Sequence, residues 1–186
     1  MKMRYSDVYK SWQDDPEAFW MKQAEAIDWV KAPSKALHAD NAPLYEWYKD
    51  AQVNACYNAV DRHVEQGRGD QTAIIYDSPI TGRKSKTSFA ELQTQTASLA
   101  GALRDKGIVA GDRVIIYMPM ISEALVAMLA CARIGAVHSV VFGGFAAHEL
   151  AVRIEDATPK AILAASCGLE PNRVVAYKPL IDDAIS

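Results

Sequence analysis

Residues 113–145 read RVIIYMPMISEALVAMLACARIGAVHSVVFGGF, and they decide the fold of this chain. Two short apolar runs, 114–117 and 136–142, lack polar alternation, which is typical of strands that are buried on both faces of a parallel sheet. The apolar segment between them predicts a helix that is covered on several sides, with Ser122 as its N-cap and Gly135 as its end. Strand, helix and strand in this order predict a right-handed crossover unit.

Crossover units of this kind bind ligands at the carboxyl ends of their strands. The first predicted strand stops at Pro119, and the second ends in Phe-Gly-Gly-Phe at 142–145. Two successive residues without Cβ allow a ligand or another stretch of backbone to approach closely. A tight turn from strand to helix explains the two glycines equally well, so both interpretations stay open.

The composition predicts a globular protein whose partners are not polyanions. The chain has 186 residues, 50% of them hydrophobic and 23% charged, with a formal net charge of -3. No block of Lys and Arg is present, which argues against nonspecific binding to nucleic acid. The three cysteines are far apart and form no CxxC pair, so neither a disulfide framework nor a zinc site is expected.

The sequence also predicts a cytoplasmic protein without a membrane partner. Its first residues include acids and lack the apolar core of a signal peptide. Its longest apolar run is much shorter than the roughly 20 residues that a membrane-spanning helix needs.

Residues 1–50 are expected to form an N-terminal helical arm with a linker. Two short helices should meet at Asp15 and Pro16, a good N-cap followed by a good first helical residue. Trp12 and Trp20 are among several aromatic residues in this arm. They fit either a clamp that holds the arm on a larger body or, less simply, a cage for a ligand.

Residues 51–186 are expected to form the first part of an α/β domain. A hairpin over 72–87 precedes a helix that begins at a capping box, Ser88 to Glu91, and 160–165 read as a third parallel strand. The predicted fold class is α/β: a partial doubly wound sheet of three parallel strands, with the hairpin as its antiparallel edge and helices on both faces. An exposed last strand predicts some self-association.

Known catalytic motifs are missing from the chain. The sequence has no GxxxxGK[ST] loop, no GxSxG elbow and no complete dinucleotide fingerprint. His148 and Glu149 lack the second histidine of a zinc helix, so no metal site is predicted. Arg173, in a predicted loop after the third strand, can form a fork onto a phosphate or can simply be solvated.

The chain closely resembles the N-terminal portion of the short-chain, AMP-forming acyl-CoA synthetases, which are acetyl- and propionyl-CoA synthetases of the adenylate-forming superfamily. The resemblance covers essentially the whole chain and rests on DDPEAFW (14–20), NACYNAVDRH (54–63), VIIYMPMISEALVAMLACARIGAVHSVVFGGF (114–145) and YKPLIDDAI (177–185). It implies that the fold is a truncated adenylate-forming large domain. Within the family, IIYDSPITG (74–82) and SCGLEPNRVVAYKP (166–179) resemble the propionate-activating branch.

The resemblance implies a two-step reaction with ATP, a short-chain carboxylate and CoA as substrates and Mg²⁺ bound with ATP. The carboxylate attacks the α-phosphate to form an acyl-adenylate and pyrophosphate, and the CoA thiol then displaces AMP. In the family, the phosphate loop, the acyl pocket and the catalytic lysine lie downstream of the residues present here. No catalytic residue and no Mg²⁺ ligand is therefore expected in this chain.

The resemblance does imply a CoA site within these residues. Phe142, Gly143 and Gly144 would flank the adenine, and Arg173 would meet the 3′-phosphate. Acetate-branch relatives carry an additional Arg at the position of Glu170 in this chain. The Glu170 side chain is expected either to turn outward, away from the phosphate, or to orient Arg173. The whole predicted CoA site consists of Phe142, Gly143, Gly144, Glu170, Pro171, Asn172 and Arg173.

We therefore expect the N-terminal segment of a propionate–CoA ligase, inactive without the remainder of its parent chain. Two alternatives stay open, a segment of an acetate–CoA ligase and a non-catalytic module that binds CoA or a nucleotide.

Overall fold

The computed structural model describes residues 4–144 and 146–186, so Phe145 of the Phe-Gly-Gly-Phe segment lies outside the described residues. The chain divides into two compact units, Met1–Asn54 and Ala55–Ser186.

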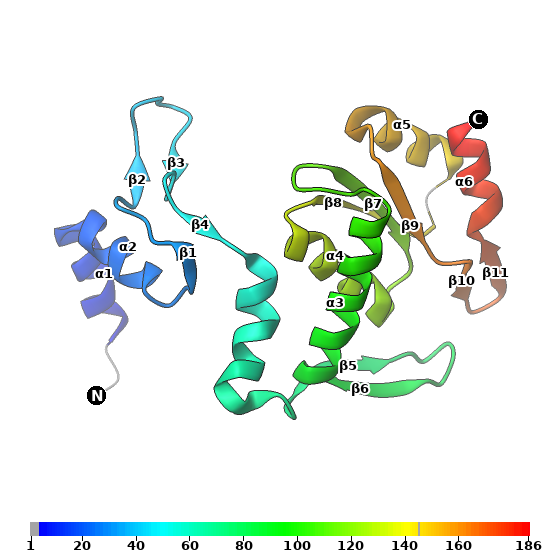
Figure 1. Cartoon of the computed structure of the whole chain (residues 1–186), viewed down its shortest axis with the longest axis horizontal. Coiled ribbons are helices and arrows are strands. Elements are labelled where there is room, and N and C mark those ends of the chain that lie inside the picture. Colours follow the sequence, from blue (N-terminus) through cyan, green and yellow to red (C-terminus); the bar gives the residue numbers. More distant parts are fainter. Residues whose placement is uncertain (1–3, 145) are drawn as a thin grey trace. The chain divides into compact units, whose positions relative to one another are not determined.

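Over its described residues, 4–54, the first unit forms two helices and four very short strands. Figure 1 shows their arrangement in the chain. Asp15 accepts a hydrogen bond from the Ala18 amide at 2.9 Å and caps the second helix, which begins at Pro16 as the sequence predicts. Further along, where an irregular linker is expected, two antiparallel strand pairs form, β1 with β4 and β2 with β3. The elements are α1 (Tyr5–Asp14), α2 (Pro16–Ala24), β1 (Trp29–Lys31), β2 (Leu37–His38), β3 (Glu46–Trp47) and β4 (Gln52–Val53).

The second unit begins with a helical segment that is partly wound as π-helix. It contains η1 (Tyr57–Asp61) and η2 (Val64–Arg68), with Gly67 at a φ of 76°. The left-handed φ is the reason that a glycine fits this position.

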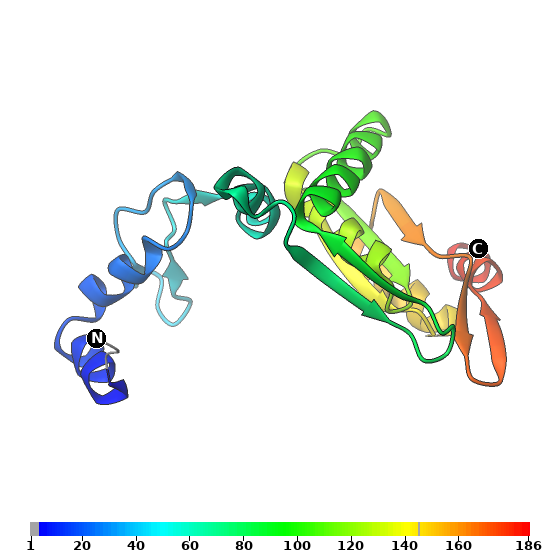
Figure 2. The ribbon, with the colours of Figure 1, turned by 90° about the horizontal axis from the view of Figure 1, so that it is seen from below.

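The central sheet has three parallel strands, as predicted. They are β7 (Arg113–Met118), β8 (Val137–Phe142) and β9 (Ala161–Ala164), in the order β8-β7-β9. Residues 114–117 of β7 are fully buried. Helices lie against both faces of this strand, because Val114 packs in a cluster with α3 (Phe89–Asp105) and α4 (Ser122–Ile134), whereas Ile115 and Tyr117 pack in another with α5 (Ala147–Ala157) and α6 (Tyr177–Ile185) (Figure 2).

The hairpin forms but is not an edge of the parallel sheet. Its strands β5 (Thr72–Asp77) and β6 (Lys84–Ser88) pair only with each other. Ala73 and Ile74 instead pack against Leu92 of α3 and Val126 of α4. The hairpin therefore attaches to the helical layer through an apolar face, and the prediction of an edge hairpin is wrong.

The prediction that β8 is buried on both faces is also wrong. Of its six residues only Val141 is buried, whereas Val137 and Val140 are each 52% exposed and Phe142 is 61% exposed. β8 lies at an edge of the sheet, and Val141 is its one residue in the buried clusters that cover the two faces of β7, so most of its side chains lie outside those clusters.

The caps of α3 and α4 differ in a way that the sequence does not predict. The Ser88 hydroxyl accepts from the Glu91 amide at 3.2 Å, and the Glu91 carboxylate accepts from the Ser88 amide at 2.7 Å, so the capping box of α3 is confirmed. In α4 the N-cap is Ile121, because its carbonyl already accepts from the Ala124 amide; Ser122 is the first helical residue and the expected cap is wrong. Gly135 ends α4 at a φ of 75°, as predicted.

We expect Ser88→Ala to lower the free energy of unfolding by about 1 kcal/mol, because it removes an N-cap oxygen from α3. Ser122→Ala is the matched control and should change stability by less than about 0.5 kcal/mol, since no side-chain hydrogen bond caps α4. Urea unfolding followed by circular dichroism measures both. Equal losses in the two variants would show that the capping box is not what stabilises α3.

Candidate functional site

Three of the seven predicted CoA-site residues line one small cavity at the carboxyl edge of the sheet. The cavity has a volume of about 120 Å³ and includes Phe142, Gly143 and Glu170 in its wall. Its other walls come from Pro119 and Met120 after β7, from β10 (Cys167–Glu170) and β11 (Arg173–Ala176), and from Tyr177. The crossover unit predicts a ligand site at this edge, and that site stays a prediction.

Glu170 to Arg173 do not form the expected loop. They form the tip of an antiparallel hairpin in which Glu170 pairs with Arg173, leaving Pro171 and Asn172 as the turn (Figure 1). Proline and asparagine are favoured turn residues, and the β-branched residues that follow Arg173 favour a strand. The hairpin gives these four residues a defined backbone instead of a loose one.

The Arg173 guanidinium is held by the carboxylate of Glu170, its partner across the hairpin. Its Nε donates to Glu170 Oε2 at 2.7 Å and its Nη2 donates to Oε1 at 3.3 Å. This hydrogen bond and charge lower the pKa of Glu170 and raise the pKa of Arg173. Both side chains are well exposed, so the pair contributes little to stability and orients the guanidinium at the hairpin tip.

The two glycines after Phe142 differ in their surroundings. A Cβ on Gly143 would lie 2.7 Å from the carbonyl carbon of Met118, which is too close for any side chain. A Cβ on Gly144 would meet only the ring of Phe142, at 3.2 Å. Crowding by the surrounding backbone thus explains why residue 143 is a glycine, as the tight-turn interpretation requires. Gly144 is less crowded and leaves space for an approaching ligand.

The turn at residues 142–144 is held by hydrogen bonds to two of its backbone carbonyls. The Gly144 amide donates to the Phe142 carbonyl at 2.8 Å, and the buried Tyr177 hydroxyl donates to the Gly143 carbonyl. Sequence reasoning missed Tyr177, because a tyrosine at the start of an amphipathic helix carries no signal of its hydrogen-bond partner.

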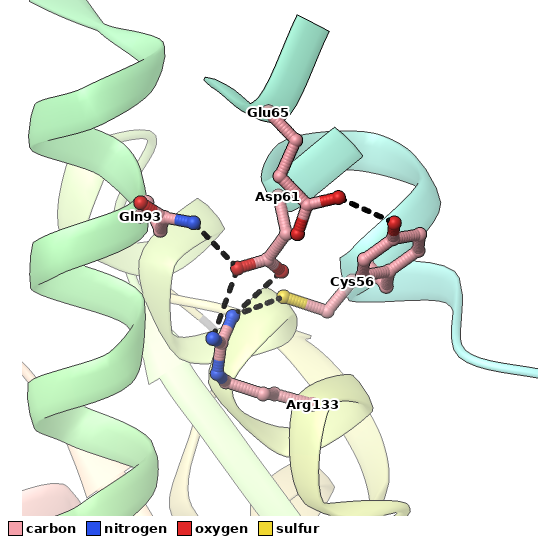
Figure 3. Close-up of polar contacts among 6 residues, drawn as sticks. Cys56, Asp61, Glu65, Gln93 and Arg133 are labelled. Carbon is pink, nitrogen blue, oxygen red and sulfur yellow. Dashed lines mark hydrogen bonds and ion pairs between the residues drawn. The ribbon is translucent and has the colours of Figure 1, made fainter. Parts of the chain in front are cut away.

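A second polar cluster lies away from this edge and was also missed (Figure 3). Arg133 of α4 donates to the Asp61 carboxylate from Nη1 at 2.8 Å and from Nη2 at 2.9 Å. Gln93 of α3 donates to the same carboxylate at 2.8 Å, and Arg133 also reaches the Cys56 sulfur at 3.6 Å. Burial raises the pKa of the Cys56 thiol. The cluster joins three helical segments, so we interpret it as structural.

Two properties of the described part of the chain bear on other functions. Among residues 4–144 and 146–186, no group of three or more His, Cys, Asp or Glu side chains is placed to hold a metal ion. Over the same residues, none of the helices has both the length and the apolar character needed to cross a membrane.

Comparisons with known proteins add the family. The sequence model described as AMP-binding enzyme matches residues 60–184, and the model described as acetyl-coenzyme A synthetase N-terminus matches residues 5–59.

Three relatives show the range of similar proteins. Bovine acyl-CoA synthetase short-chain family member 3, mitochondrial, is 52% identical over 92% of this chain. The acetyl-coenzyme A synthetase of Streptomyces avermitilis is 45% identical over 97% of the chain, and the propionate–CoA ligase of Escherichia coli is 43% identical over 99%. The chain spans 25%, 28% and 29% of these relatives' own lengths, respectively.

These comparisons do not decide every prediction. Relatives named for acetate and for propionate are similarly close, and one name refers to mitochondria, so the acyl substrate and the cytoplasmic location stay predictions. The AMP-binding model nevertheless matches more than half of the chain, and the acetyl-coenzyme A synthetase model matches the residues before it. This chain therefore belongs to the AMP-binding enzyme family, within the short-chain acyl-CoA synthetases that the sequence resembles.

Proposed function

We propose that this chain is the N-terminal segment of an AMP-forming propionate–CoA ligase, and that it supplies part of the surface that binds CoA. The overall reaction converts ATP, propionate and CoA into propionyl-CoA, AMP and pyrophosphate. The observation that supports the proposal most directly is one cavity that is lined both by Phe142 and Gly143 at the end of β8 and by the β10–β11 hairpin, in which Glu170 pairs with Arg173. The domain proposal stays as the sequence predicts, with a helical arm at 1–50 and the first α/β part at 51–186.

The chemistry of this edge suits the nucleotide end of CoA. The Phe142 side chain is 61% exposed and offers an aromatic face to the adenine. Gly144 leaves room for close approach, and Arg173 carries a cation for the 3′-phosphate. Pro171 and Asn172 set the turn that places the cation.

Glu170 does not block this role. A guanidinium has five N–H donors, and the contacts with Glu170 use two of the three nitrogens. The remaining donors can meet phosphate oxygens while Glu170 holds the guanidinium plane in place. Repulsion between Glu170 and the phosphate is reduced because Arg173 lies against the carboxylate and both are solvated.

The proposed activity requires residues beyond this segment. We propose that the ATP site, its Mg²⁺ and the catalytic lysine lie on the remainder of the parent chain, and that residues 1–186 alone are inactive. Self-association through the exposed edge at the last parallel strand, β9, stays a prediction as well.

A chimera tests the proposal. The chain would replace its matching segment in the E. coli propionate–CoA ligase, with which it is 43% identical. We expect the chimera to form propionyl-CoA, and the isolated 186-residue chain to catalyse no propionate-dependent pyrophosphate exchange. Exchange by the isolated chain, or a folded chimera that exchanges pyrophosphate but never uses CoA, would contradict the proposal.

Arg173→Ala in this chimera should raise the KM for CoA at least tenfold, because a charge-assisted hydrogen bond to phosphate is lost. Dephospho-CoA lacks the 3′-phosphate, so the KM for dephospho-CoA should be the same in the unmodified chimera and in its Arg173→Ala variant. Pyrophosphate exchange, which needs no CoA, should not change. Arg104→Ala, at the exposed end of α3, is the matched control and should leave every constant unaltered.

The two alternatives have their own measurements. Acyl preference is tested on the product of the complete gene, where a higher kcat/KM for acetate than for propionate would replace our proposal by an acetate–CoA ligase. Titration calorimetry of the 186-residue chain with CoA addresses the non-catalytic module. A dedicated module should bind with a free energy near -8 kcal/mol, about 1 μM, whereas we expect much weaker binding by half a site.

A further inference from the structure

Tyr177 connects the two parts of the proposed CoA site. It is the first residue of α6 and follows directly on β11 of the hairpin that carries Arg173. Its side chain is fully buried, and its ring lies 4.8 Å from that of Tyr117. From there its hydroxyl donates a hydrogen bond to the Gly143 carbonyl at the end of β8. One side chain thus links the hairpin to the glycine turn.

Two glycines make the space that the Tyr177 side chain fills. A Cβ on Gly143 would lie 2.5 Å from the phenol oxygen. A Cβ on Gly168, in β10, would lie 2.9 Å from the Cζ atom of the same ring. Neither distance is compatible with a side chain, so the end of β8 and the start of the hairpin are both shaped around this phenol. A loosely placed aromatic side chain would not need two such neighbours.

The backbone of Tyr177 is fixed as firmly as its side chain. Its amide donates to the Ser166 carbonyl at 3.0 Å, immediately before β10. Burial is the main cause of the raised pKa of the phenol, so the phenol keeps its proton at neutral pH and remains a donor. Without that donor the Gly143 carbonyl, which lies against Met118, would lose its partner beside a crowded backbone.

We infer that Tyr177 is a positioning residue for CoA: by holding the Gly143 carbonyl it fixes the turn that presents Phe142 and Gly144 to the nucleotide. This inference rests on the proposed function. Within the described residues of the turn, the Gly144 amide donates to the Phe142 carbonyl, and glycine has wide backbone freedom. The Tyr177 hydroxyl removes that freedom at Gly143, and the Phe142 ring keeps one orientation at the cavity.

Tyr177→Phe in the chimera tests this role, because it removes the donor and keeps the ring. We expect the KM for CoA to rise about fivefold to tenfold, as for the loss of one buried hydrogen bond. The KM for dephospho-CoA should rise by the same factor, since the adenine contact is affected and the phosphate contact is not. Pyrophosphate exchange with propionate and ATP should stay unchanged.

A second readout does not depend on activity. Hydrogen exchange followed by mass spectrometry should become faster in the peptide that contains Phe142 to Gly144. Tyr48→Phe is the matched control, because it removes a phenol hydroxyl whose hydrogen bond goes to the Trp20 carbonyl in the first unit. This control should change neither the KM for CoA nor the rate of hydrogen exchange in the peptide that contains Phe142 to Gly144.

The outcomes separate this inference from the proposed function. If Arg173→Ala raises the KM for CoA and Tyr177→Phe does not, the CoA site stands and the role of Tyr177 is wrong. If neither variant affects CoA, the proposed site itself is wrong, and the inference is wrong with it. If Tyr177→Phe lowers pyrophosphate exchange and CoA turnover together with the melting temperature, Tyr177 is only structural and the inference is again overturned.

Discussion

Arg133→Met should lower the free energy of unfolding of the Ala55–Ser186 unit by about 3 kcal/mol or more, since it leaves a buried carboxylate without its cation. Asp61 is only 6% exposed. It accepts two hydrogen bonds from Arg133, and after the substitution Gln93 would still donate to it but could not balance its charge. Urea unfolding monitored by circular dichroism measures the loss.

Two further variants show whether the buried charge is the cause. Replacing both partners, Asp61→Leu with Arg133→Met, should recover much of the stability, because no uncompensated charge remains. Lys178→Met breaks the exposed pair with Asp182 and should cost less than about 1 kcal/mol. If the double variant were no more stable than Arg133→Met, lost packing would be the better explanation.

Gly143→Ala should destabilise the same unit by about 3 kcal/mol, near the upper end for an overpacked site. The new methyl group would lie 2.7 Å from the carbonyl carbon and 2.8 Å from the carbonyl oxygen of Met118. These are backbone atoms of the central strand β7, whose preceding residues are fully buried, so they cannot move aside cheaply. Thermal or urea unfolding provides the measurement.

Gly101→Ala is the matched control for this substitution. Gly101 lies within α3, and a Cβ at that position would meet nothing within 4 Å. Alanine is the better helix former there, so we expect a gain of about 0.5 to 1 kcal/mol. A Gly143→Ala protein as stable as the parent would show that the turn after β8 can shift, and the explanation of that glycine by crowding would then be wrong.

The sequence predicted the local features of this fold well. The capping box at Ser88, the helix end at Gly135 and the three parallel strands are present. Each of these features depends on residues that are neighbours in the chain, or on an apolar pattern that repeats over a short window. The resemblance to acyl-CoA synthetases likewise rests on continuous segments, and the family comparisons confirm it.

Two of the errors concern how an element is covered or attached. The apolar run of β8 predicts a strand, but its exposure depends on which helices pack on its faces, and only Val141 of β8 belongs to the buried clusters that cover β7. The pattern over 72–87 predicts a hairpin, but a hairpin pattern does not show whether the hairpin attaches by pairing with a sheet or by packing on helices.

For the candidate site, the sequence by itself determined that residues 142–143 and 170–173 come at or after the carboxyl ends of parallel strands. Because such ends share one edge of a sheet, the two segments were expected at the same edge. Only the tertiary structure decided that Tyr177 donates to Gly143 and that Asp61 pairs with Arg133. Both contacts join residues far apart in the chain, and hydrogen bonds at that separation follow from how the helices and strands pack, which no spacing in the sequence encodes.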